Sequence, residues 1–221
     1  MSLPQRIEGL RARIQHACEA AGRDPATVEL LPVSKKQPLS LIREAVGLGF
    51  TRFGENYVQE GAEKAAAMPE LGFVLLGALQ RNKAKAALQH FAEIQSLDRP
   101  ELAERLRRLA EELGVVRPAW IQVDLWDEAT KLGGCTERDL PALIDALGDD
   151  ARLPLRGLMA IPPPDDDGAF LQMATLRDRL QQGLGRALRL SMGMSDDLEA
   201  AIAAGSDQIR IGTAFFGERT R

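Results

Sequence analysis

The chain alternates short apolar segments with amphipathic helical segments along most of its length, and this alternation constrains the fold most. Eight short segments have the apolar character of strands buried in a parallel sheet: VELLPVSKK, TRFGE, GFVLLG, EIQSLD, AWIQVDL, LRGLMAI, ALRLSMG and DQIRIGT. A segment with helical spacing separates each strand from the next. Such alternation implies a parallel sheet, and eight units favour a closed barrel over an open doubly wound sheet.

The helical segments are also read from their periodicity. One precedes the first strand and ends near Gly22, and the others are LSLIREAVGL and residues 57–67, 79–91, 101–113, 137–147, 169–182 and 196–204. Asp196 and Glu199 fit a capping box for the last helix, although Ser195 could equally be its cap. The prediction is an α/β chain forming one domain over residues 1–221, a (β/α)8 TIM-type barrel with an extra N-terminal helix.

Composition excludes several classes of protein. The formal net charge of −4 argues against binding to nucleic acid through phosphate neutralisation. The N-terminus lacks an apolar signal core and no stretch reaches the ~20 apolar residues of a membrane span, so a cytoplasmic protein is expected. Cys18 and Cys135 are expected to be free thiols, and His16 and His90 lack the spacing of metal ligands.

In a parallel barrel the loops after the strands carry the site, and lysine is concentrated there. The chain has six lysines against 22 arginines, and Lys35, Lys36, Lys83 and Lys131 fall at or just after strand ends. Unlike guanidinium, an amine can lose its proton and attack a carbonyl. Lys35 ends a buried strand, but strand periodicity lets only one of Lys35 and Lys36 point into the barrel and does not decide which.

Two further loops resemble an anion site. Ser191, Gly193 and Ser195 precede a helix after the seventh strand, while Gly212 and Thr213 follow the eighth. Small residues and helix N-termini present N–H groups to phosphate, and these are the loops where barrels often bind it. Ordinary turns are the alternative for either loop alone.

The remaining candidates at strand ends are single residues. Arg210 could be a donor at the barrel mouth or a salt-bridged strand residue. Asn56 could face a ligand or serve a turn, and the same alternatives apply with less force to Asn82. Tyr57, the only tyrosine, is interpreted as a packing residue.

Several motifs together resemble one family. VSKKQP, FGENYVQE, LQRNK, RGLMAIPPP, SMGMSDDLEAAIAAGS and RIGTAFFG are similar to segments of the pyridoxal phosphate homeostasis proteins, known in bacteria by the name YggS. The resemblance runs from about Val28 to Gly217, and the pair SMGMSDD and RIGTxxFG is its most specific part. It implies a barrel similar to the N-terminal domain of alanine racemase.

The resemblance also implies a role for each site residue. Lys35 would hold pyridoxal 5′-phosphate covalently as a Schiff base, which removes the ambiguity between Lys35 and Lys36. Ser195, Gly212 and Thr213 would bind its phosphate, with Ser191 a weaker candidate in the same loop. Arg210 would face the pyridine nitrogen and Asn56 would lie near the ring.

The chain departs from the family pattern at two places. Phe73-Val74-Leu75-Leu76 stands where the family commonly has Trp-His-Phe-Ile, so a role of that histidine would be lost here. The loop with Asp127, Glu128 and Lys131 matches only loosely, which leaves a role for Lys131 in doubt.

The expected function is reversible binding of pyridoxal phosphate in intracellular vitamin B6 homeostasis. No catalytic residue is assigned, because racemisation by two bases needs an acid/base opposite the lysine and no added domain is seen to supply one. The alternatives are a pyridoxal-phosphate-dependent amino-acid racemase of low activity and a phosphate-binding barrel enzyme without the cofactor. The expected partners are the cofactor and either apo-enzymes or amino acids, with no nucleic acid, membrane or metal, and the chain is expected to be a monomer.

Overall fold

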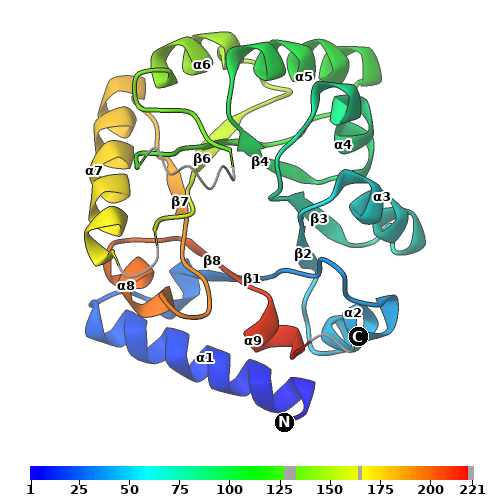
Figure 1. Ribbon diagram of the computed structural model, residues 1–221, viewed down its shortest axis with the longest axis vertical. Helices are drawn as coiled ribbons and strands as arrows, with labels where there is room; N and C mark the ends of the chain where they lie inside the picture. The colour runs from blue at the N-terminus through cyan, green and yellow to red at the C-terminus, as the bar shows by residue number, and fades with distance from the viewer. Residues whose placement is uncertain (127–132, 164–165, 219–221) are drawn as a thin grey trace.

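Eight parallel strands form one sheet that curls into a ring (Figure 1). The computed structural model describes residues 1–126, 133–163 and 166–218. The strands are β1 (Glu29–Pro32), β2 (Arg52–Glu55), β3 (Gly72–Leu75), β4 (Glu93–Leu97), β5 (Ala119–Gln122), β6 (Leu155–Met159), β7 (Arg189–Ser191) and β8 (Gln208–Ile211). Each lies within a segment that the sequence predicts to be a strand, so the eightfold alternation is confirmed.

Helices surround the ring on its outside (Figure 1). They are α1 (Leu3–Ala20), α2 (Leu39–Gly47), α3 (Val58–Ala67), α4 (Ala84–His90), α5 (Pro100–Leu113), α6 (Leu140–Leu147), α7 (Asp167–Leu184), α8 (Leu198–Ala203) and α9 (Thr213–Phe216). The 3-10 turns are η1 (Pro25–Thr27) and η2 (Arg81–Lys83). The helices agree with the periodicity, except that η2 replaces the first turn expected before α4 and that α9 was not predicted.

The sheet runs in the order β1-β8-β7-β6-β5-β4-β3-β2 and closes between β1 and β2. Closure occurs just past the end of β1, where Val33 forms a parallel bridge with Gly54 and the Ser34 amide donates to the Gly54 carbonyl at 2.8 Å. A β-carbon on Gly54 would approach Leu76 to 2.5 Å, so glycine allows the interior side chains to come this close. The (β/α)8 barrel predicted from the sequence is confirmed.

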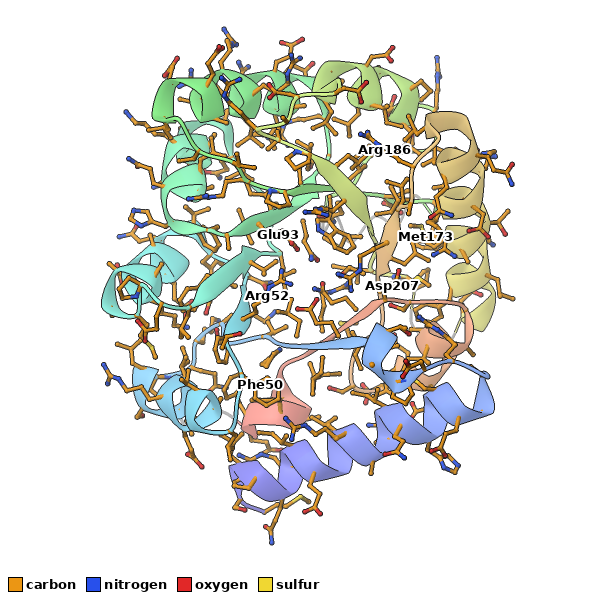
Figure 2. The ribbon with its side chains drawn as sticks, turned by 180° about the vertical axis from the view of Figure 1, so that it is seen from behind. Phe50, Arg52, Glu93, Met173, Arg186 and Asp207 are labelled. Atoms are coloured by element: carbon orange, nitrogen blue, oxygen red, sulfur yellow. The ribbon has the colours of Figure 1, made fainter. Side chains whose placement is uncertain are left out.

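The barrel interior is partly apolar and partly polar. Leu31, Val33, Val74 and Leu76 form a buried cluster separate from the main core between strands and helices. At the amino ends of the strands, Arg52 donates to Glu29 at 2.9 Å and to Glu93 at 3.0 Å. Figure 2 shows Arg52 and Glu93 pointing into the centre of the ring, while Met173 lies between α7 and the strands.

The extra N-terminal helix predicted from the sequence is α1, which lies along α8 and α9 (Figure 1). Its apolar stripe is buried there, including Leu3, Ile7 and Ile14. The expected capping box of Asp196 and Glu199 is wrong. The residue before α8 is Asp197 and neither Asp196 nor Ser195, so Glu199 is the second residue of the helix and not the third, as a capping box requires. Glu199 forms a two-bond ion pair with Arg13 of α1 at 2.8 and 2.9 Å. Among the described residues, no helix has the length and apolar character needed to cross a bilayer.

Both cysteines are free, as the sequence predicts, and the structure places both in buried positions. Burial raises the pKa of the Cys18 thiol, and burial together with Asp98 raises that of Cys135 to about 12. At pH 8 Cys135 is therefore almost entirely the protonated thiol, which is a poor nucleophile.

We expect neither thiol to react with an excess of a disulfide reagent in the native protein over minutes, and both to react in denaturant. Colorimetric titration of thiols with and without denaturant measures this difference. Rapid release of one equivalent from the native protein would contradict the burial of the two side chains.

Candidate functional site

A cavity of about 590 Å³ opens at the carboxyl ends of the strands, on the face where parallel barrels carry their sites. It is lined by Val33, Lys35, Gln37, Asn56, Leu76, Met159, Ile161, Met194, Ser195, Asp196, Arg210, Gly212, Thr213 and Ala214. The cavity brings together six of the seven predicted site residues, from loops that are as much as 178 residues apart in the chain. The seventh, Ser191, does not line it.

Lys35 and Lys36 leave the end of β1 in different directions. Lys35 is half-buried and lines the cavity, whereas Lys36 is exposed and lies outside its lining. The backbone at Lys36 has φ of 59°, in the left-handed region that costs a residue with a β-carbon about 1 kcal/mol. This turn, which strand periodicity does not describe, separates the two amines.

Asn56 follows β2 and is half-buried at the cavity wall, while Asn82 is exposed and does not line it. Tyr57 precedes α3 and is 50% exposed, also outside the lining. The backbone of Asn56 lies against Gly77 in the loop after β3. A β-carbon on Gly77 would lie 2.0 Å from the Asn56 carbonyl oxygen, so only glycine permits this approach.

Gly77→Ala should therefore destabilise the protein strongly. The clash is with backbone atoms, which cannot rotate away, and we expect a loss of about 3 kcal/mol in the free energy of unfolding. Thermal unfolding measures this as a fall in Tm of roughly 6–12 °C for a chain of this size. Gly183→Ala in α7 is the matched control, because an added β-carbon there meets nothing within 4 Å. Equal Tm values for the two variants would show that the two loops do not touch as described.

The loops after β7 and β8 form the polar side of the cavity. Ser195 lines it from the first loop, and Gly212 and Thr213 line it where α9 begins. The first N–H groups of a helix have no partner within the helix, so Thr213 and Ala214 present donors at this position. Gly193 has φ of 96°, and a β-carbon there would lie 2.5 Å from Ala201 of α8. This close turn places Ser195 at the cavity.

Arg210 brings a buried positive charge to the cavity. Its side chain donates to the Ser191 hydroxyl at 2.9 Å and to the Ala160 carbonyl at 2.8 Å, which uses two of its five N–H donors. Burial lowers the pKa of Arg210 to about 10, partly offset by the charge of Asp197. Among the described residues, no carboxylate forms an ion pair with it. A buried cation without a paired anion is costly, so an anionic ligand in the cavity would be favoured.

Ser191 holds the Arg210 side chain through a hydrogen bond inside the barrel. Its hydroxyl accepts from Arg210 and lies 2.8 Å from Oε1 of Gln208 and 2.9 Å from Oε1 of Gln95. Those amides donate onward, Gln208 to Glu29 at 2.9 Å and Gln95 to Glu93 at 2.7 Å. A chain of hydrogen bonds thus crosses the barrel interior from Arg210 to the acidic pair at its other end.

The sequence did not predict this chain of hydrogen bonds or several of the residues that line the cavity. Gln95 and Gln208 are polar residues within otherwise apolar strands, a signal that could have indicated an interior network. Gln37, Ile161 and Asp196 line the cavity from loops that the strand pattern already located. Val74, at the family's histidine position, belongs to the apolar interior cluster. Asp127, Glu128 and Lys131 lie outside the described residues.

The barrel and its cavity define the class of protein, and the family model described as "Alanine racemase, N-terminal domain" matches residues 6–220. An alanine racemase from Clostridium difficile 630 shares the fold, with a TM-score of 0.73 at 12% identity over 96% of this chain and 57% of that chain.

The chain belongs to the family of the pyridoxal phosphate homeostasis proteins. It is 43% identical to the pyridoxal phosphate homeostasis protein of Pseudomonas aeruginosa over 232 residues, covering 99% of this chain and 96% of the relative. The structure of PipY from Synechococcus elongatus PCC7942 with pyridoxal phosphate bound is 38% identical, with a TM-score of 0.86 over 98% of this chain and 100% of PipY.

Proposed function

We propose that the cavity binds pyridoxal 5′-phosphate, that Lys35 holds it covalently as a Schiff base, and that the protein serves intracellular vitamin B6 homeostasis. One observation carries the proposal. A single cavity combines a lysine amine, a buried arginine without an ion-pair partner among the described residues, and the N–H groups at the start of α9. The names of the relatives support the same cofactor.

The residues present fit this group by their chemistry. Pyridoxal phosphate carries an aldehyde, an aromatic ring and a dianionic phosphate, so its site needs an amine, apolar walls and anion donors. Lys35 is the amine, Leu76, Met159 and Ile161 are apolar walls, and Ser195, Gly212 and Thr213 are small polar residues. A volume of about 590 Å³ lies within the usual range of roughly 300–1,000 Å³ for small-molecule sites.

Each residue of the chain has a distinct task in this proposal. The bound cofactor supplies an aldehyde that condenses with an amine, releasing one water for each C=N bond formed. Nζ of Lys35 is that amine, and its half-buried side chain lines the cavity. Ser195, Gly212 and Thr213 would donate to the phosphate. Arg210 would face the pyridine nitrogen, where a cation disfavours protonation, and Asn56 would border the ring.

We propose that this site binds and releases the cofactor and does not catalyse a reaction on amino acids. Racemisation requires a proton donor and acceptor opposite the lysine. Apart from Lys35 and Arg210, the titratable side chain on the described cavity wall is that of Asp196, which is exposed at the rim. Tyr57, the only tyrosine, is outside the wall. We further propose a monomer whose partners are pyridoxal phosphate and the apo-enzymes that receive it.

A titration of the purified protein with pyridoxal phosphate, followed by visible absorption, tests the binding proposal. We expect saturation at one equivalent and bleaching on addition of borohydride. An unchanged spectrum of the added cofactor would contradict it.

In the same preparation we expect no solvent deuterium at the α-carbon of alanine, and its incorporation would favour the racemase alternative. Transfer to an apo-enzyme no faster than from free cofactor would remove the delivery role.

A further inference from the structure

The two peptide groups on either side of Lys35 are held by two residues of α3, one turn apart. Nζ of Lys64 donates to the Ser34 carbonyl, which precedes Lys35, at 2.6 Å. A carboxylate oxygen of Glu60 accepts from the Lys36 amide, which follows Lys35. Neither bond involves the Lys35 side chain, so both act on the direction in which the backbone presents it.

Lys64, Glu60 and Glu55 form one ion cluster, which we call the α3 cluster. Nζ of Lys64 lies 2.7 Å from Oε1 of Glu55 and 2.7 Å from Oε1 of Glu60. The Ser34 hydroxyl donates to the same oxygen of Glu55 at 2.6 Å. The Lys64 side chain is 7% exposed and that of Glu55 is fully buried, whereas that of Glu60 is 26% exposed.

Stability alone gives a poor reason for such a cluster. Removing charges from water costs about as much as, or more than, their attraction returns, and apolar replacements are often neutral or stabilising. Burial raises the pKa of Glu55 despite its bonds from Lys64 and Ser34, and its second carboxylate oxygen is buried with no hydrogen-bond partner among the described residues. The cluster does, however, hydrogen-bond directly to the backbone of the turn formed by Ser34, Lys35 and Lys36.

We propose that the α3 cluster selects which of the two adjacent lysines enters the cavity, with Lys64 and Glu60 as positioning residues for Lys35. The bond from the Lys36 amide to Glu60 holds Lys36 in its left-handed conformation and its side chain outside. The bond from Lys64 to the Ser34 carbonyl fixes the start of the same turn. Without these bonds the turn relaxes, and Lys36 competes for the cavity. This inference rests on the proposed function of Lys35.

The test measures how a covalent label divides between the two lysines. Wild type, Glu60→Ala and Lys64→Met are incubated with pyridoxal phosphate, reduced with borohydride, digested, and analysed by mass spectrometry of the peptide containing both residues. We expect label on Lys35 alone in wild type and on both lysines in the variants. Loss of a charge-assisted hydrogen bond should also weaken cofactor binding about tenfold or more.

Two controls separate this result from a general loss of structure. Glu63→Gln and Lys85→Met remove charges from exposed positions on α3 and α4, and we expect them to label as wild type does. Glu60→Gln keeps an oxygen that can accept from the Lys36 amide, so it should retain most of the selectivity. A purely structural role would lower Tm without moving label to Lys36. Circular dichroism checks that each variant is folded, and Glu60, whose side chain is partly exposed, leaves a space open to solvent when truncated.

The outcomes are distinguishable. Wild type labelled on Lys35, with folded Glu60→Ala and Lys64→Met labelled only there at unchanged affinity, would overturn the selection by the α3 cluster and leave the proposed function standing. Wild type without label on Lys35 would overturn the proposed function, and the inference with it.

Discussion

Lys35→Ala abolishes the covalent attachment of pyridoxal phosphate, and this is the largest effect that we expect from a single substitution. Lys35 is the only lysine on the described wall of the cavity. Alanine has no amine, and the exposed Lys36 points elsewhere. The purified variant should be colourless after incubation with cofactor and gel filtration, and borohydride should leave its mass unchanged.

Lys36→Ala is the matched control for that experiment. It removes the neighbouring amine, whose side chain is exposed and outside the cavity lining. We expect its absorption spectrum and its reducible label to equal those of wild type. A coloured, reducible Lys35→Ala protein would show that the cofactor is attached to a lysine other than Lys35. A colourless Lys36→Ala protein would show that Lys36 is needed for the attachment.

Arg210→Met should cause the second-largest effect, a loss of cofactor affinity with little loss of stability. In the proposed site Arg210 would donate to the pyridine nitrogen, and a hydrogen bond that involves a charged group contributes about 1.5–3 kcal/mol. We therefore expect an increase in Kd of about a hundredfold, measured by absorption titration.

Stability should respond differently to the same change. Methionine removes a buried charge without an ion-pair partner among the described residues, which is favourable, but leaves the Ser191 hydroxyl and the Ala160 carbonyl without their donor. These effects oppose each other, so we expect Tm to change by less than about 5 °C. Arg156→Met, at an exposed position on β6, is the control and should leave both Kd and Tm close to wild type. Unaltered affinity of Arg210→Met would remove Arg210 from the binding site.

The sequence predicts the barrel well because each strand and helix is encoded locally. Alternating apolar strands and amphipathic helices require no knowledge of distant contacts, and the strand ends then locate the site loops. Prediction failed where a distant residue decides the outcome. Helix α8 begins later than a capping box with Asp196 requires, and Glu199 is paired with Arg13, 186 positions earlier. The different directions of the Lys35 and Lys36 side chains depend on a left-handed turn after β1. Glu60 and Lys64 of α3 hydrogen-bond to the backbone of that turn.

The candidate site shows the same division. Lys35, Asn56, Ser195, Arg210, Gly212 and Thr213 all border one cavity, because parallel strands bring their carboxyl ends to one face. Ser191 has the same local signature as Ser195 but is buried under Arg210. Ser191 is the last residue of β7, and its hydroxyl lies beside the side chains of Gln95 and Gln208, which come from other strands. Sequence alone therefore does not separate a residue that lines the cavity from one that supports it.

The most direct test of the central claim is the mass of the wild-type protein after incubation with pyridoxal phosphate and reduction with borohydride, followed by mapping of the modified peptide. We predict the addition of one pyridoxyl phosphate group per chain, located on Lys35. An unmodified protein, or a single modification at a lysine outside the cavity, would contradict the proposal that this cavity holds the cofactor on Lys35.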